Sequence, residues 1–475
     1  MTELHEARTG SRTGSRAGAR GGGRAVAAVV TCQLMLMVDG VIVTVALPYI
    51  REEFGLSAVG LSWVVSAYAL AFAGFLLVSG RLGMMFGPRR VLLVGAAIFV
   101  VASAAGGLAP SGELLIAARA VQGVGAALAG PAIMVLLVAN TDEGPQRLRG
   151  MSWFIIGSSL GSCLGLVAGG ILTVALDWRW VMLINVPVGA AVIVGTVAFA
   201  READRTPGRL DIPGALASAV TMVALVHGLT RAGQEGWGDP VVLGSLALAL
   251  LALVVLVAVE SRAAHPVVPL RLLRGARRAV PYAGMLLVPA MMIGFFTFSV
   301  LFLQDVRHFD ALEAGLAYLP WGASVIIGAR LVPVLVARIG DRGTIILGIA
   351  LGLAGLVAFV LLAADAPLWA GVLLPCFVFG FTAPFFFTPA SAAIMAAAEG
   401  EDSGAAAGMF QAMQQLGGAI GVATLTAVFT SRAAAGVEPA METAMLASTA
   451  FGLVLLVLAL ATPAFAGRRP APVPA

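Results

Sequence analysis

One acidic residue, Asp39, lies near the middle of the first long apolar segment of the chain, residues 25–48. The segment is long enough to cross a lipid bilayer, which takes about 20 apolar residues. A charged carboxylate at the centre of a bilayer costs at least about 2.5–3.5 kcal/mol, so its presence indicates a function such as carrying a proton or acting as a counter-ion. A second interpretation is structural, in which Asp39 stays protonated and hydrogen-bonds to the helix backbone.

A basic residue, Arg119, lies inside another long apolar segment, residues 114–138. A guanidinium there needs an acceptor from a carboxylate or from backbone carbonyls. If Arg119 lies near Asp39, its charge favours the ionised carboxylate, whereas an apolar pocket favours the neutral acid. A carboxylate balanced between these effects could load a proton on one side of a membrane and release it on the other. The alternative is that Arg119 only extends its head group to the outer membrane surface.

The composition indicates that most of this chain is surrounded by lipid. Apolar residues make up 60% and charged residues 11% of the sequence, and the mean hydropathy is +0.98. A water-soluble chain carries about 25% charged residues, so we expect an integral membrane protein. All 29 basic residues are arginines that lie between the apolar segments instead of forming one patch, which argues against nucleic acid as a partner.

The sequence predicts no metal site, no ATP site and no catalytic group. Cys32, Cys163 and Cys376 lie inside apolar segments, the four histidines form no HExxH motif, and no Walker-type phosphate loop occurs. No nucleophile, base and orienting group can be assembled from the remaining polar residues. We therefore expect neither an enzyme nor a cofactor.

Fourteen apolar segments of roughly 20 residues predict an all-α fold with fourteen transmembrane helices. They are residues 25–48, 61–79, 91–109, 114–138, 151–175, 180–200, 212–229, 241–259, 280–303, 314–336, 344–363, 368–397, 405–430 and 444–466. The polar, arginine-rich residues 1–24 predict a disordered tail. Residues 467–475 form a second predicted tail.

Arginine is distributed unevenly among the connections between these segments. If the N-terminus lies in the cytoplasm, 22 of the 29 arginines lie in cytoplasmic parts of the chain and five lie in outer loops. Because arginine in short loops sets the orientation of a membrane protein, this asymmetry predicts that both termini and both tails are cytoplasmic.

The chain also contains an internal repeat. The sequence GPRRVLLVG from Gly87 is echoed by GDRGTIILG from Gly340, with Gly, Arg and Gly in register. The repeat predicts two parallel six-helix halves, residues 25–200 and 280–466, flanking two extra helices and their linkers in residues 201–279. Parallel halves with a site between them are an architecture of alternating-access transporters.

Four motifs together carry a resemblance to a known family. The segment around Asp39 reads VDGVIVTVALP, the segment around Arg119 reads LIAARAVQGVGAA, and two others read DWRWVMLINVPVG and AGMFQAMQQLGGAIGVA. They resemble motifs of the major facilitator superfamily, in its fourteen-helix drug:proton antiporter branch, and the resemblance covers almost everything after residue 24. It implies an exporter in which Asp39 carries the proton and Arg119 tunes it.

The resemblance also implies which residues belong to the motifs that change conformation. GSCLGLVAGG keeps the glycines of the family's GxxxGPxxGG but has Leu166 in place of proline, and GRLGMMFGPRR resembles GxLaDrxGrk with Met84 in place of the acid. Glycines spaced four apart also predict close approach of another helix. The matching residues are Gln122, Gly123, Gly125, Gly161, Gly165, Gly169, Gly170, Gly80, Gly87 and Arg89.

Aromatic and methionine side chains concentrate in the second half and predict the surface that contacts substrate. Such side chains adapt to lipophilic ligands of varied shape. The predicted substrate contacts are Phe295, Phe298, Trp321, Phe385, Phe386, Met409, Phe410, Met413 and Gln414. Because the second half has no acid at mid-membrane depth, we expect neutral or singly charged substrates.

These observations predict a proton-coupled exporter of lipophilic drugs, antibiotics or secondary metabolites. We expect it to act as a monomer in the cytoplasmic membrane, in contact with the bilayer and driven by the proton gradient. Two alternatives stay open. One is an uncoupled or uptake-direction transporter, suggested by Met84 and Leu166, and the other is a membrane sensor or scaffold on a transporter fold.

Overall fold

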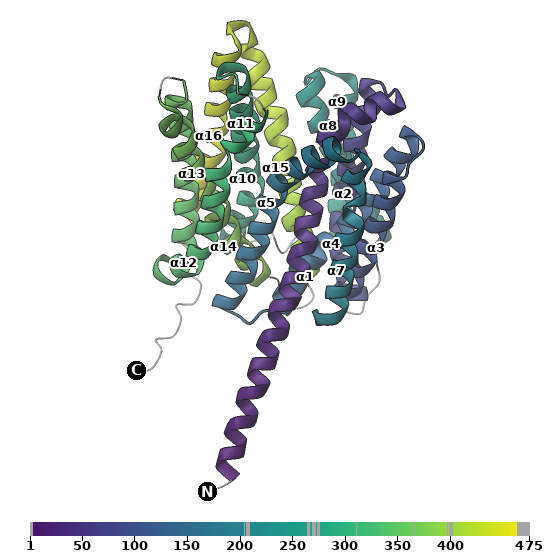
Figure 1. Ribbon diagram of the computed structural model, residues 1–475, viewed down its shortest axis with the longest axis vertical. Coiled ribbons are helices and arrows are strands. Elements are labelled where there is room, and N and C mark those ends of the chain that lie inside the picture. The colour runs from purple at the N-terminus through teal and green to yellow at the C-terminus, as the bar shows by residue number, and fades with distance from the viewer. Residues whose placement is uncertain are drawn as a thin grey trace.

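The computed structural model describes residues 3–462, except 204, 206–209, 264–266, 268–271, 273–275, 310, 365, 397 and 399–401. Over these residues all regular secondary structure is helical. Figure 1 shows the long helices lying side by side with roughly parallel axes. The predicted tail 467–475 and parts of the linkers in 201–279 lie outside the described residues.

The first half of the chain forms seven helices. Ser57 and Ser111 cap two of them, because their side chains accept hydrogen bonds from the amides of Gly60 (3.1 Å) and Leu114 (3.4 Å). The helices are α1 (Glu3–Phe54), α2 (Ala58–Phe86), α3 (Pro88–Gly107), α4 (Gly112–Ala139), α5 (Pro145–Ala175), α6 (Arg179–Leu183) and α7 (Asn185–Phe199).

The N-terminal residues differ from the expectation of disorder, because α1 is helical from Glu3. Figure 1 shows this part of α1 projecting beyond the other helices. Extending a helix that is already formed avoids the cost of nucleating one, so the spanning part of α1 can propagate into a polar sequence.

Two helices, α8 (Ile212–Glu235) and α9 (Pro240–Glu260), form a central hairpin. Asp239 accepts hydrogen bonds from the amides of Val241 (2.8 Å) and Val242 (3.0 Å) and so caps α9. The same carboxylate pairs with Arg231 of α8 at 3.1 Å, and this pairing lowers the pKa of Asp239. One side chain therefore fixes both the start of α9 and the hairpin turn.

The second half begins at α10 (Ala276–Leu301), which continues as a π-helix, Phe302–Val306. A second π-helix, Trp369–Leu373, leads into α13. The other helices are α11 (Ala311–Leu316), α12 (Leu319–Leu362), α13 (Leu374–Gly380), α14 (Thr382–Ala396), α15 (Ser403–Arg432) and α16 (Val437–Ala461).

The described residues contain twelve helical stretches that are long and apolar enough to cross a membrane. The sequence predicted fourteen. Predicted segments 314–336 and 344–363 lie, except for residue 363, within one of these stretches, Glu313–Leu362, although the backbone inside α12 is non-helical at Gly340. Helix α5, with 31 residues, is not among the twelve. The chain is a multi-pass membrane protein.

The repeat found in the sequence corresponds to a repeated structure. Gly87 and Gly340 both have positive φ, +96° and +74°, a backbone conformation that favours glycine. Two residues later, the Arg89 side chain donates to the carbonyls of Thr196 (3.3 Å) and Val197 (2.6 Å) at the end of α7. Arg342 donates in the same way to the end of α16, at Ala459 (3.1 Å) and Leu460 (2.7 Å).

The backbone turns at Gly87 and Gly340 lie at one end of the helical bundle. The connections α2–α3 and α4–α5 lie there, with Arg89, Arg90, Arg147 and Arg149. We call it the arginine-rich end. The connections α1–α2, α3–α4 and α8–α9 lie at the opposite end.

We predict that Arg89→Ala destabilises the first half by about 1–2 kcal/mol, because a cation at a helix C-terminus is lost together with two charge-assisted hydrogen bonds. Thermal unfolding of the purified protein in detergent measures this effect as a lower Tm. The neighbouring Arg90 is exposed and provides the matched control, Arg90→Ala. Equal Tm values for the two variants would contradict the assigned role of Arg89.

Candidate functional site

Asp39 and Arg119 form a buried ion pair in the first half. The Asp39 Oδ2 atom lies 2.7 Å from Arg119 Nη1, and the side chains are 0% and 1% exposed. The two charged residues that the sequence singled out are therefore in direct contact. Replacing both charges of a buried pair often leaves stability unchanged, but removing one partner leaves an uncompensated charge and costs about 3–5 kcal/mol of stability.

The second oxygen of Asp39 accepts two further hydrogen bonds from side-chain amides. Gln122 Nε2 donates to Oδ1 at 2.8 Å, and Asn185 Nδ2 donates to the same atom at 2.7 Å. Gln122 Nε2 also donates to Ser103 Oγ at 2.6 Å. Each of these contacts to Asp39 comes from a donor, so the arrangement fits an ionised carboxylate and not an acid bonded to the helix backbone.

Arg119 is held by three further contacts inside the bundle. Its Nε atom donates to the carbonyl of Val64 at 3.2 Å, and Nη1 donates to Gln122 Oε1 at 2.7 Å. The guanidinium carbon lies 4.3 Å from the centroid of the Tyr68 ring, a cation–π contact. The interpretation that Arg119 extends to the membrane surface is therefore wrong, because its head group has acceptors within the protein.

Five helices bring these side chains together. Asp39 comes from α1, and Arg119 and Gln122 lie one turn apart on α4. Ser103 comes from α3, and Tyr68 comes from α2. Asn185 is the first residue of α7, directly after the break that separates α6 from α7.

Two glycines of α4 allow the neighbouring helices to approach this site. A Cβ atom on Gly123 would overlap the carbonyl of Tyr68 in α2. On Gly125 it would lie 2.7 Å from the carbonyl of Gly95 in α3. Both glycines of the Arg119 motif therefore act through close packing beside the ion pair.

The glycines of α5 pack along α1 on either side of Asp39. An added Cβ would lie 2.6 Å from Met37 Cβ at Gly161, 2.8 Å from the Val38 carbonyl at Gly165 and 3.0 Å from the Ile42 carbonyl at Gly169. The predicted ridge of small residues therefore meets the segment that carries Asp39. Gly170 differs, since no atom of the described part of the chain lies within 4 Å of its added Cβ.

The remaining predicted conformational residues lie near the arginine-rich end. Gly80 of α2 meets Gly404 of α15 so closely that a Cβ on either would overlap the other's carbonyl. Gly87 lies beside the Glu202 side chain, and the Arg89 amide donates to Glu202 Oε1 at 2.9 Å. Met84, which stands where the family has an acid, is buried and contacts Ser403.

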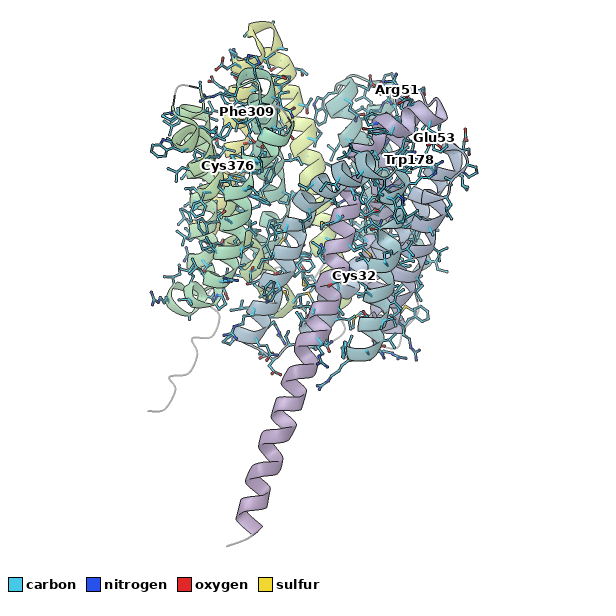
Figure 2. The ribbon with its side chains drawn as sticks, in the orientation of Figure 1. Cys32, Arg51, Glu53, Trp178, Phe309 and Cys376 are labelled. Atoms are coloured by element: carbon cyan, nitrogen blue, oxygen red, sulfur yellow. The ribbon has the colours of Figure 1, made fainter. Side chains whose placement is uncertain are left out.

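A cluster of polar and aromatic groups joins α1 to α6 at the opposite end. Glu53 Oε2 accepts from Trp178 Nε1 at 2.6 Å and from Arg179 Nη1 at 2.8 Å. Figure 2 shows Glu53 and Trp178 near one another, at the end of the bundle away from the N-terminus. This cluster anchors the start of the segment that carries Asn185.

The predicted substrate contacts do not form one surface. Phe295 stacks on Phe379 with ring centroids 3.9 Å apart, and Phe298 stacks on Phe429 at 5.5 Å, so both pack inside the second half. Phe385 packs against Gly348 of α12, and Phe386 against Gly284 of α10. We therefore assign these four rings to the core of the second half.

Other predicted substrate contacts have different surroundings. Trp321 is buried edge-on against Phe296, with ring centroids 5.0 Å apart, and its Nε1 atom has no hydrogen-bond partner among the described residues. Phe410 lies where the halves meet, 6.4 Å from the Phe154 ring of α5. Gln414 donates to Met285 Sδ at 3.7 Å. Met409 is buried and Met413 is half-buried.

Sequence reasoning missed Asn185 and Ser103 as members of the site. Asn185 belongs to the motif DWRWVMLINVPVG, which was used only to support the resemblance. Ser103 stands among small apolar residues and has no distinguishing neighbour. A polar residue within an apolar segment is the only signal that could have found it.

The family model described as Major Facilitator Superfamily matches residues 29–422 of this chain. The chain belongs to the major facilitator superfamily. This confirms the resemblance inferred from the motifs, and membership of a transporter family agrees with the expectation that the chain is not an enzyme.

Curated relatives extend over nearly the whole chain. The cephamycin export protein CmcT of Amycolatopsis lactamdurans is 35% identical over 448 residues, covering 93% of this chain and 92% of the relative. The lincomycin resistance protein of Streptomyces lincolnensis is 36% identical, with 83% and 82% covered. The tetracenomycin C resistance and export protein of Streptomyces glaucescens is 33% identical, with 85% and 75% covered.

Solved structures share the fold at low sequence identity. The human organic anion transporter MFSD10 (TETRAN) has a TM-score of 0.66 and 16% identity, with 92% of this chain and 99% of that chain covered. The proton:xylose symporter XylE has a TM-score of 0.64 and 13% identity, with 93% and 95% covered. The all-helical major facilitator fold is therefore established for this chain.

We predict that Gly165→Val lowers export activity and Tm together. A valine side chain cannot fit against the backbone of α1, and overpacking typically costs about 1–3 kcal/mol. Displacement of α1 also moves Asp39 relative to Arg119. Gly170→Val, on the same helix but facing open space, is the control and leaves both quantities close to those of the unmodified protein. Equal losses in the two variants would contradict the packing role of Gly165.

Proposed function

We propose that this chain is a proton-coupled exporter of lipophilic drugs, antibiotics or secondary metabolites. The observation that carries the proposal is the buried Asp39 carboxylate, which can change charge and is bound by donors from two other helices, α4 and α7. Gln122 of α4 also donates to Ser103 of α3. The names of the relatives support the choice of cargo, since they describe export of or resistance to antibiotics. No cofactor is required for this chemistry.

The proposed coupling follows from the geometry of the site. With Asp39 ionised, its charge balances Arg119, and both amides have an acceptor. A proton on Asp39 removes this charge and turns one oxygen into a donor, so the bonds to Arg119 and to the amides weaken. Because those bonds tie α1 to α4 and α7, protonation loosens the first half, and release of the proton on the other side restores it.

We also propose fourteen spanning helices, arranged as two six-helix halves around the α8–α9 hairpin. Dividing the stretch Glu313–Leu362 at Gly340 and adding α5 to the twelve stretches gives this number. The arginine-rich end would face the cytoplasm by the positive-inside rule, with both termini there and the protein in the cytoplasmic membrane. We propose a monomer, with the bilayer and a small lipophilic molecule as its partners.

One observation favours a second candidate, a transporter without tight proton coupling. Met84 occupies the α2–α15 contact where the family has an acid, so this contact lacks a charge that responds to its surroundings. Such a protein would keep its substrate path but would move its cargo independently of the proton gradient. A sensor or scaffold function has less support, because Asp39 and Arg119 retain a buried arrangement that costs free energy.

We predict that Asp39→Asn abolishes export driven by a pH gradient in proteoliposomes while substrate binding is retained. Asparagine keeps the size of the side chain but cannot gain or lose a proton at neutral pH. The measurement is efflux of a fluorescent lipophilic substrate on imposing the gradient. Glu143→Gln, which changes a carboxylate that is 76% exposed, is the control and leaves export unchanged. Export by Asp39→Asn at the unmodified rate would favour the uncoupled transporter.

We predict that the protein exports lipophilic monocations at least about tenfold faster than dications of similar size, since a second buried positive charge needs a second carboxylate. The acids of α10–α16 within the described residues lie near helix ends or, in the case of Asp341, next to the non-helical Gly340 inside α12. Gln411→Glu adds a carboxylate where α15 faces Gly130 of α4. This variant should export dications at a rate closer to that of monocations. Equal export of both cations by the unmodified protein would contradict this prediction.

A further inference from the structure

Helix α2 of the first half contacts helix α15 of the second half, and at the arginine-rich end their backbones touch directly. Gly80 meets Gly404, and a Cβ on Gly408 would lie 3.0 Å from the carbonyl of Leu76. Ser403 Oγ lies 3.2 Å from Met84 Sδ. The two backbones are therefore in contact there, and the structure is closed at this end of the α2–α15 interface.

Toward the opposite end, α8 takes the place of α2 against α15. A Cβ on Gly233 of α8 would lie 3.1 Å from Val422 Cγ1 and 3.4 Å from the Val422 carbonyl. Val422 follows Gly408 by about four helical turns and so lies on the same face of α15. A buried apolar cluster surrounds this contact, formed by Leu229, Ala232, Val242, Ala419 and Ala423.

Helix α8 also packs against α2. A Cβ on Gly74 of α2 would lie 2.8 Å from Val223 Cγ2, near the middle of both helices. Closer to the opposite end, the rings of Trp63 and His227 stack with centroids 6.5 Å apart and planes at 19°. Helix α8 thus touches α2 at the middle of the bundle and toward its opposite end, and it touches α15 toward the opposite end.

We propose that α8 is a movable wedge that competes with α2 for one face of α15. While the arginine-rich end is closed, α8 occupies that face near the opposite end and keeps α2 away from it. Closing the opposite end requires α2 to approach α15, so α8 must leave the Ala419–Val422–Ala423 surface. Because its contact with α2 includes the middle of the bundle, at Gly74 and Val223, α8 moves with the first half. This inference rests on the proposed transport cycle, in which the two ends open in turn.

Two disulfides test which contact breaks during the cycle. The chain used has Cys32→Ala, Cys163→Ala and Cys376→Ala, and carries either Gly233→Cys with Val422→Cys or Gly74→Cys with Val223→Cys. Both pairs are close enough for the Cβ separation of about 3.5–4.5 Å that a disulfide needs. We expect the α8–α15 disulfide to stop export and a reductant to restore it, while the α8–α2 disulfide leaves export unchanged.

Either of two results would overturn the proposal. Continued export with the α8–α15 disulfide formed would mean that α8 stays on α15 throughout the cycle. Loss of export with the α8–α2 disulfide, restored by reductant, would mean that α8 does not travel with the first half. Recovery on reduction separates a blocked movement from a failure to fold.

A second measurement needs neither substrate nor a proton gradient and so remains valid if the proposed function is wrong. Spin labels at Glu143→Cys and Ile339→Cys, both exposed and on different halves near the arginine-rich end, report the distance across that end. Leu229→Ala weakens the α8–α15 cluster and should raise the population with this end open by about tenfold, equivalent to about 1.4 kcal/mol. Leu251→Ala, on the exposed face of α9, is the control. If Leu229→Ala leaves the population with an open arginine-rich end unchanged, the proposal that α8 competes with α2 for α15 is overturned.

Discussion

A fully buried carboxylate constrains the whole first half of this protein. Asp39 is fully buried, and a charge in that position persists only if donors surround it. The chain supplies those donors from α4 and α7, and Gln122 is itself held by Ser103 of α3. The close helix packing around the site follows from this requirement, because hydrogen bonds of 2.7–2.8 Å leave no freedom in the spacing of the helices.

The glycines can be understood as the means of meeting that spacing. Gly123 and Gly125 let α2 and α3 approach α4 beside Arg119, and Gly161 and Gly165 let α5 lie against the turn of α1 that precedes Asp39. Without a hydrophobic driving force between helices in lipid, such packing and the polar contacts are what hold the helices together. The ion pair and the small residues are therefore two parts of one arrangement.

The two halves share a turn and a helix-end contact but differ in the side chains that fill their interiors. Gly87 with Arg89 and Gly340 with Arg342 build the same turn and the same helix-end contact in each half. The first half is organised around a charged network, whereas the second half packs rings such as Phe295, Phe359 and Phe379. The charged network therefore lies in one half, and the other half has an aromatic core.

The sequence by itself determined that the chain is helical and lies in a membrane, that it repeats, and that Asp39 and Arg119 are costly enough to matter. Those conclusions depend on residue type and spacing, which need no partner. Only the tertiary structure decided that Asn185, 146 residues after Asp39, completes the site, and that most of the predicted substrate rings are core residues. It also showed that α8 lies against both halves. The physical reason is the same in each case: in lipid nearly all helix faces are apolar, so composition does not reveal which neighbour a given face will meet.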